Sequence, residues 1–291
     1  MAITSAMVKE LRERTGLGMM DCKKALEAAG GDMEKAIEDL RKSSALKAAK
    51  KAGRTTAEGL LGLKLADDGT RGAMIEINIE TDFAAKNEKF LAFLGKALDE
   101  VFASGADIEA LNAGPLGDER QALVQEIGEN ITLRRASVLE SSNGGVGGYL
   151  HTDKKKGALV LLSGPQAEIA RDIAMHITGV DPAPQVVNPD QVPEAVVAKE
   201  RDVFVSQAAE SGKPPEIVEK MVEGRVRKFL AEISLVNQPF VKDPNQTVGA
   251  LLKGASVSCD GFDRFVVGEG IDVEQTDFAA EVAAQLKKDD D

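Results

Sequence analysis

The side chains best suited to chemistry are scarce in this chain. Its 291 residues include two histidines, His151 and His176, and two cysteines, Cys22 and Cys259. None of them belongs to an HExxH motif or to a His/Cys cluster with the spacing of a zinc site. The sequence also lacks the phosphate-binding GxxxxGK[ST], the dinucleotide-binding GxGxxG and the GxSxG of a nucleophilic serine. We therefore predict that the protein is not an enzyme and that it uses no metal ion or other cofactor.

The composition limits the compartment and the partners. The two cysteines form no CxxC pair, which is typical of free thiols in a reducing compartment. The net charge of −12 argues against direct binding to nucleic acid, which requires a basic surface. No apolar run approaches the roughly 20 residues that span a bilayer, and the first residues lack the apolar core of a signal peptide. These features predict a cytoplasmic protein, with a cleaved organelle precursor as the alternative.

The pentapeptide Thr-Asp-Phe-Ala-Ala occurs twice, at residues 81–85 and 276–280, in a chain with 10 phenylalanines and no tryptophan. Thr or Asp before a helix-forming run is a common N-cap, because its side-chain oxygen accepts a free backbone N–H. The cap does not explain the phenylalanine behind it. Phe83 either packs into the core or stands out beside Asp82 at a rigid corner, where an aromatic ring can fill a pocket of a partner.

Residues 4–52 are expected to be helical. TGLG at residues 15–18 and the glycine pair before Asp32 separate three short helices. This arrangement resembles the ubiquitin-associated type of module, which we assign to residues 1–54. Within it, residues 41–54 carry six basic residues and no acid, which either form a solvated helix face or steer an acidic partner.

From residue 56 the apolar pattern changes to the alternation that is typical of strands. Residues 55–142 fit a hairpin, a long helix that runs from the first pentapeptide to Leu98 or Phe102, a helical stretch near 118–128 and a third strand. After a glycine-rich boundary, strand, polar turn, strand and helix recur, with a returning strand expected at 264–270. We therefore predict an α+β fold with two similar halves of antiparallel sheet plus helix, residues 55–142 and residues 143–187 with 235–270.

A helical hairpin is predicted to interrupt the second half at residues 188–234, and a C-terminal helical module is assigned to residues 271–291. Two amphipathic segments flank SGKPP and can pair in antiparallel fashion. The hairpin either buries its own apolar faces or acts as an arm that contacts another chain. The predicted stripes are Val196, Val203 and Phe204 in the first helix, and Val218, Met221, Val222, Phe229 and Ile233 in the second.

Two segments resemble the signatures of a known family. LRERTGLGMMDCKKAL at residues 11–26 and EINIETDFAAK at residues 76–86 are similar to segments of bacterial elongation factor Ts, the guanine-nucleotide exchange factor of elongation factor Tu. The resemblance covers nearly the whole chain, with the motifs in the family's order. Ala84 is a departure, because the family usually has valine there. A binding adaptor that recognises ubiquitin-like folds through its N-terminal module is the alternative.

The resemblance implies a translation factor that binds GDP-bound and nucleotide-free elongation factor Tu. It would promote GDP release by displacing the support of Mg²⁺ and the nucleotide, so that GTP can bind. We expect no contact with nucleic acid or a membrane, and a homodimer or a two-to-two complex stays open. Asp82 and Phe83 would insert near the phosphates, whereas the second pentapeptide would cap a terminal helix. The implied contact residues are Lys9, Arg12, Met19, Met20, Lys23, Asp82, Phe83, Ala84, Ala85, His151, Val241 and Gln285.

Overall fold

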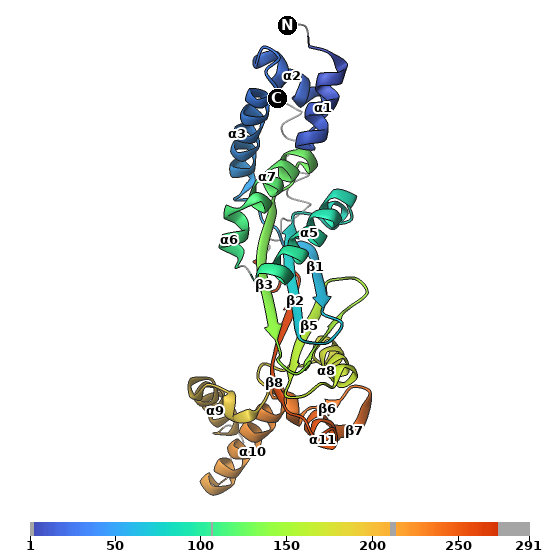
Figure 1. Cartoon of the computed structure of the whole chain (residues 1–291). Coiled ribbons are helices and arrows are strands. Elements are labelled where there is room, and N and C mark those ends of the chain that lie inside the picture. The colour runs from blue at the N-terminus through green and yellow to red at the C-terminus, as the bar shows by residue number, and fades with distance from the viewer. Residues whose placement is uncertain (1–2, 106, 210–213, 273–291) are drawn as a thin grey trace, which may run out of the picture.

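The computed structural model describes residues 3–105, 107–209 and 214–272, and it shows an elongated molecule (Figure 1). A helical module forms one end, two sheets with their helices form the middle, and a helical hairpin projects at the other end. This mixture of helices with small antiparallel sheets agrees with the predicted α+β class. Within the described ranges, each helix is too short or too polar to cross a bilayer.

Three helices pack around an apolar centre at the N-terminal end: α1 (Ser5–Thr15), α2 (Met19–Ala28) and α3 (Met33–Lys51). Thr4 caps α1 by accepting a hydrogen bond from the backbone N–H of Met7, and Asp32 caps α3 in the same way. The chain leaves α1 at Gly16, whose φ of 72° suits glycine because it has no Cβ. The fully buried residues between the helices include Leu11, Cys22 and Leu26.

The third helix continues into the body of the molecule. α3 packs along α7 (Pro115–Ile127), where the hydroxyl of Ser44 donates a hydrogen bond to Gln125 at 2.6 Å. Ala48 is buried in the core beneath the first sheet. Just beyond α3, the backbone carbonyl of Arg54 accepts a hydrogen bond from the side-chain amide of Asn130 at 3.0 Å. The N-terminal module is thus fastened to the body through the second half of α3.

The first sheet is antiparallel and has the strand order β1-β2-β3. Helices cover one of its faces with side chains such as Phe90 and Phe93, and burying each contributes about 1.5–3 kcal/mol. The long helix expected after the hairpin is interrupted, because Asn87 caps a new helix through the backbone N–H of Lys89. Besides α7, the elements are β1 (Glu58–Leu65), β2 (Arg71–Ile79), α4 (Asp82–Ala85), α5 (Glu88–Ser104), α6 (Ile108–Ala113) and β3 (Ile131–Glu140).

The second sheet repeats this plan with the strand order β4-β5-β8. Its last strand begins earlier than predicted and shares only residues 264–266 with the expected 264–270, because the chain turns at Gly268, which has a φ of 75°. A Cβ atom at Gly268 would lie 2.2 Å from the carbonyl oxygen of Ala57, so only glycine fits. The elements are β4 (Val146–Leu150), β5 (Lys156–Leu162), α8 (Ala167–Gly179), η1 (Pro189–Gln191), η2 (Leu235–Asn237), β6 (Pro239–Phe240), β7 (Asp243–Thr247), α11 (Val248–Gly254) and β8 (Cys259–Val266).

The two sheets meet through an apolar layer and one buried acid. The carboxylate of Glu76 in β2 accepts hydrogen bonds from Arg134 at 2.8 Å, Arg135 at 2.6 Å and the backbone N–H of Gly268 at 2.9 Å. Burial acts to raise the pKa of Glu76, but the hydrogen bonds from Gly268 and the two arginines outweigh it and lower the pKa. An ionised carboxylate therefore ties the first sheet to the end of β8. The buried apolar layer consists of Leu61, Met74, Leu159 and Phe265.

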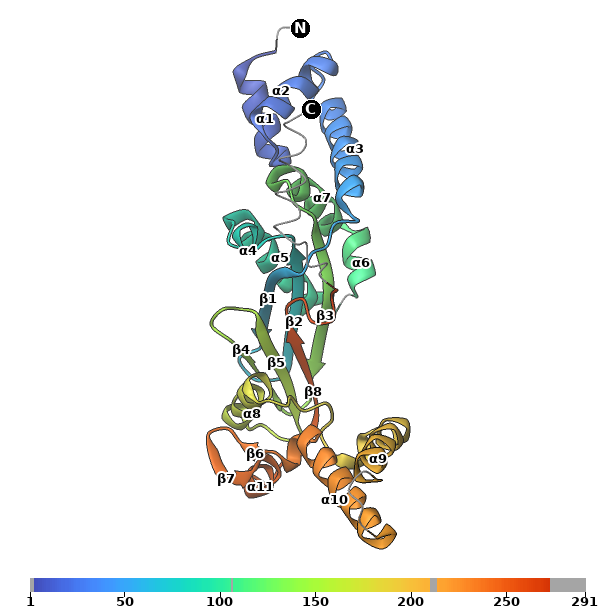
Figure 2. The ribbon, with the colours of Figure 1, turned by 180° about the vertical axis from the view of Figure 1, so that it is seen from behind.

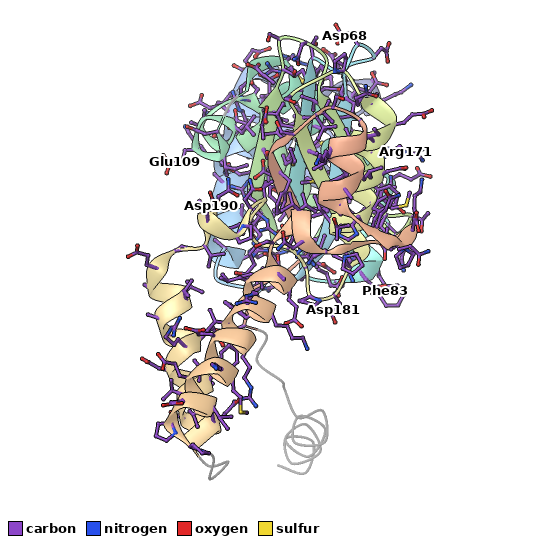
Figure 3. The ribbon with its side chains drawn as sticks, turned by 90° about the horizontal axis from the view of Figure 1, so that it is seen from below. Asp68, Phe83, Glu109, Arg171, Asp181 and Asp190 are labelled. Carbon is purple, nitrogen blue, oxygen red and sulfur yellow. The ribbon has the colours of Figure 1, made fainter. Side chains whose placement is uncertain are left out.

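The helical hairpin consists of α9 (Glu194–Ala209) and α10 (Pro215–Ile233), and it projects from the body in Figure 3. Both predicted stripes are wrong in part, because Met221 and Phe229 of α10 and two valines of α9 lie outside the packed cluster. Val196 and Val203 are 38% and 42% exposed. The side chains of α9 that pack against α10 lie one residue further along, about 100° around the helix. The packed cluster is Val197, Phe204, Ala208, Val218, Val222, Val226 and Leu230.

Candidate partner-contact surface

Residues 81–85 form a corner between β2 and α5, which we call the α4 corner. The hydroxyl of Thr81 accepts a hydrogen bond from the backbone N–H of Ala84 at 3.2 Å, as predicted for an N-cap. Ala85 is 1% exposed and Ala84 packs against the same core, so both alanines hold the turn in place. Phe83 is 81% exposed and points away from the ribbon (Figure 3). The interpretation of Phe83 as a core residue is therefore wrong.

A lysine one turn further along completes the α4 corner. The Lys86 ammonium lies 2.9 Å from the Asp82 carboxylate and 5.5 Å from the centroid of the Phe83 ring. The hydrogen bond from Lys86 lowers the pKa of Asp82, so the carboxylate is ionised at neutral pH. Lys86 was absent from the predicted contacts, although its i, i+4 spacing from Asp82 is a signal that the sequence contains.

The five predicted contacts of the N-terminal module are all exposed. Met19 and Met20 begin α2 and are 56% and 63% exposed, which is unusual for large apolar side chains. Lys9 and Lys23 form surface ion pairs within their own helices, to Glu13 and Glu27 at 3.8 Å each. Such pairs are worth about 0–1 kcal/mol, so a partner can replace them at little cost. The exposed contacts of this module are Lys9, Arg12, Met19, Met20 and Lys23.

Two further predicted contacts lie in loops of the second half. His151 follows β4 and is exposed, and its Nδ1 lies 3.0 Å from a carboxylate oxygen of Asp153. Val241 lies between β6 and β7 and is 48% exposed. Its backbone N–H donates a hydrogen bond to Nδ1 of His176 at 3.2 Å. The turn that displays Val241 is therefore attached to a buried histidine.

The hydrogen bonds of His176 define its protonation. Since Nδ1 accepts from Val241, Nε2 must carry the proton, which it donates to the side-chain oxygen of Gln238 at 2.9 Å. The Gln238 amide in turn donates to the backbone carbonyls of Pro182 and Glu232 at 2.9 and 2.6 Å. Burial lowers the pKa of His176, which keeps the ring neutral. His176 is fully buried, and no local pattern links it to a turn 65 residues away.

The segments that carry Phe83, His151 and Val241 share one side of the elongated molecule. In Figure 2, α4, the loop between β4 and β5, and the β6–β7 hairpin lie along the left edge of the body. Together they lie along one extended side of the body. Gln285 and the second pentapeptide lie outside the described residues. Within residues 3–105, 107–209 and 214–272, no group of three or more His, Cys, Asp or Glu side chains could hold a metal ion.

A cleft of about 820 Å³ lies elsewhere, between the α1–α2 turn, α3, α5 and α7. It contains none of the predicted contact residues that the structure describes. Six of its charged groups pair with one another across the cleft, whereas Glu13 and Arg14 pair with residues outside it. The pairs are Arg41 with Asp118, Lys89 with Glu126 and Lys96 with Glu119. The cleft therefore offers no unpaired charge to a ligand through these six side chains.

Comparison with known proteins identifies the family. The sequence model of the family described as Elongation factor TS matches residues 80–269. The chain is 56% identical over 287 residues to Elongation factor Ts of Hahella chejuensis, covering 98% of this chain and 99% of that protein. It is 54% identical over 288 residues to Elongation factor Ts of Teredinibacter turnerae, covering 98% of each chain. The chain therefore belongs to the elongation factor Ts family of translation elongation factors.

Proposed function

We propose that this chain is the guanine-nucleotide exchange factor of elongation factor Tu. It binds the GDP-bound partner, promotes the release of GDP, and leaves a nucleotide-free partner that can take up GTP. The observation that carries this proposal is the exposure of Phe83 on a turn whose Ala85 is buried. A rigidly held aromatic ring beside a carboxylate is suited to enter a pocket of another protein, where such residues supply much of the binding free energy.

Exchange of this kind follows from linkage between two binding sites on the partner. If the factor binds the nucleotide-free partner more tightly than the GDP-bound partner, GDP must bind the factor complex more weakly by the same ratio. Each tenfold weakening of GDP binding requires the factor to bind the nucleotide-free partner about 1.4 kcal/mol more favourably than it binds the GDP-bound partner. No bond is made or broken, so the factor acts by binding alone.

The charges of the α4 corner suit this task. In the partner, Mg²⁺ is a large local charge that neutralises the phosphates of the nucleotide. Phe83 would displace groups that support the ion, and the ionised Asp82 would bring a negative charge toward phosphates that are already negative. Both effects act against bound GDP and spare the empty site. Lys86 would leave Asp82 for a group on the partner, since their exposed ion pair is weak.

The remaining surfaces would bind the partner without acting on the nucleotide. The N-terminal module would contact the GTP-binding domain through its exposed lysines, arginine and methionines. His151 would contact another domain of the partner, and Val241 and Gln285 the GTP-binding domain. We place this activity in the cytoplasm, with a one-to-one or a two-to-two complex as the working assembly.

Release of labelled GDP from purified elongation factor Tu tests the proposal. We expect the chain to accelerate release, and Phe83→Ala to reduce the acceleration by roughly 30-fold, the factor that corresponds to a hot-spot residue worth about 2 kcal/mol. Leu46→Ala is the matched control, because Leu46 is an exposed apolar residue on α3 outside the proposed contacts. A release rate that the wild-type chain leaves unchanged would refute the exchange function. Full activity of a folded Phe83→Ala variant would refute the role of the α4 corner.

A further inference from the structure

Glu129, an acid from another part of the chain, accepts two hydrogen bonds from Thr81, the first residue of the α4 corner. Glu129 follows α7, 48 residues beyond Thr81. Its Oε2 accepts a hydrogen bond from the backbone N–H of Thr81 at 2.9 Å, and its Oε1 accepts one from the Thr81 hydroxyl at 2.7 Å. Hydrogen bonds to an ionised acceptor are stronger than those between neutral groups. Both oxygens of Glu129 are thus committed to one residue.

These contacts determine the direction of the cap. The hydroxyl of Thr81 has one proton, and it donates that proton to Glu129. Its lone pairs are then free to accept the backbone N–H of Ala84 at 3.2 Å, which is the hydrogen bond that begins α4. Glu129 therefore orients the group that caps the helix carrying Phe83.

The residues on either side make Glu129 a fixed support. The carboxylate of Glu80 accepts a hydrogen bond from the backbone N–H of Asn130 at 2.6 Å. The Asn130 amide donates to the backbone carbonyl of Arg54 at 3.0 Å, and Asn130 is buried. Residues 80–81 and 129–130 thus exchange hydrogen bonds in both directions. Ile79 precedes Glu80 and Ile131 follows Asn130, and these two isoleucines pair directly between β2 and β3.

We propose that Glu129 is a positioning residue for exchange: it holds Phe83 and Asp82 in the orientation that enters the partner. This inference rests on the proposed exchange function. α4 contains only four residues, so it depends on anchors outside its own backbone: the buried Ala85 holds its last turn, and the Thr81 cap holds its first. A corner that is already ordered loses less entropy when it binds. Glu129 touches neither partner nor nucleotide in this scheme and acts only through Thr81.

Glu129→Gln is the sharpest variant, because it keeps the size of the side chain and changes one oxygen into an NH₂ group. The NH₂ group is a donor, and it would face either the backbone N–H or the hydroxyl of Thr81, which are donors as well, so one of the two hydrogen bonds would be lost. We expect the acceleration of GDP release at limiting factor to fall about tenfold, which corresponds to about 1.4 kcal/mol. The matched control is Glu126→Gln on α7, since Glu126 pairs with Lys89 and makes no contact with Thr81. The control should retain the wild-type rate.

A double-mutant cycle separates positioning from general stability. If Glu129 acts through Phe83, then Glu129→Gln adds no further loss to Phe83→Ala, whereas an independent structural effect would add in full. Thr81→Val, which removes the hydroxyl, should reproduce the loss, and Thr81→Ser, which restores it, should recover the wild-type rate. These two variants provide the same test if Glu129→Gln lowers the melting temperature.

The outcomes distinguish this inference from the proposed function. Loss in Phe83→Ala together with wild-type release in Glu129→Gln and Thr81→Val would overturn the role of Glu129 and leave the exchange function intact. Additive losses in the cycle would also overturn it. A wild-type chain that does not accelerate GDP release would overturn both proposals. Non-additive losses with an unchanged Glu126→Gln control would establish Glu129 as a positioning residue.

Discussion

The backbone N–H of Val241 donates a hydrogen bond to Nδ1 of the buried His176 at 3.2 Å. An exposed apolar residue that we propose as a partner contact is thereby attached to the core of the second half. The attachment requires a neutral imidazole, because a proton on Nδ1 would face the N–H of Val241. This bond makes the geometry of one contact segment depend on pH.

The first prediction concerns that dependence. Burial lowers the pKa of His176 from its usual 6.5, so the unfolded chain takes up the proton at a higher pH than the folded chain does. The contribution of His176 to stability is complete above pH 6.5 and declines as the pH falls from 6.5 toward the lowered pKa. The slope from this one residue is at most about 1.4 kcal/mol per pH unit. Urea unfolding at pH 7.5, 6.5 and 5.5 measures it. A His176→Gln variant should lack this part of the slope, and equal slopes in both proteins would contradict the prediction.

The second prediction concerns Glu76, the fully buried carboxylate between the two sheets. Glu76→Ala should destabilise the protein by about 3–5 kcal/mol, because Arg134 and Arg135 would lose the buried carboxylate that accepts their hydrogen bonds. The control is Glu140→Ala, whose carboxylate is 66% exposed in an ion pair with Arg71 and should cost less than about 1 kcal/mol. Urea denaturation gives both values. Since the pKa of Glu76 is lowered, its contribution is present above the usual value of 4.5 and is lost as the pH falls through the lowered pKa. Equal losses in the two variants would rule out a special role for Glu76.

The third prediction concerns the N-terminal module. Removing residues 1–31 takes away α1 and α2 and leaves α3 on α7, so partner affinity should fall while the two sheets stay folded. Removing residues 1–54 also takes away Ala48 and the acceptor of Asn130. Loss of a buried hydrogen-bond partner costs about 1–3 kcal/mol, and each kcal/mol lowers the melting temperature by about 2–4 °C. Calorimetry should therefore show a lower melting temperature for the longer deletion. Unchanged affinity for elongation factor Tu in both would remove the module from the interface.

The fourth prediction concerns the helical hairpin. Ile233, Ser234 and Leu235 are buried, and the carbonyl of Ile233 accepts a hydrogen bond from the backbone N–H of Gln185 at 2.8 Å. Replacing only residues 197–228 with a short Gly/Ser linker should therefore preserve both sheets and most GDP release. Any self-association should be lost, because a projecting arm is placed to meet a second copy.

Light scattering and GDP release are measured on the same hairpin-deleted sample. The double variant Val196→Ser, Val203→Ser is the finer test, since both valines are exposed on α9. Loss of exchange in a folded monomer would assign the hairpin to the exchange mechanism and contradict the separation of the two roles.

Much of the fold could be predicted because its signals are local. Thr4, Asp32 and Thr81 cap helices through residues three positions away, and such short hydrogen bonds depend on neighbouring sequence. Alternation marked the strands and the repeated halves for the same reason. Helical periodicity was less decisive in α9, where a shift of one residue selects a different face. Only packing against α10 could distinguish Val197 from Val196.

By itself, the sequence indicated the three N-terminal helices, the hairpins of the two halves and the helical hairpin, together with the absence of known catalytic motifs and the candidate contact residues. Tertiary structure alone decided that Phe83 stands out of the core, that Glu129 holds its turn, and that His176 supports Val241. The partners in the last two pairs are 48 and 65 residues apart. Local sequence pattern does not encode a hydrogen bond between residues so far apart, nor does it encode whether a ring such as that of Phe83 is buried or exposed. Each depends on which elements pack together, and that is decided by the free energy of the whole core.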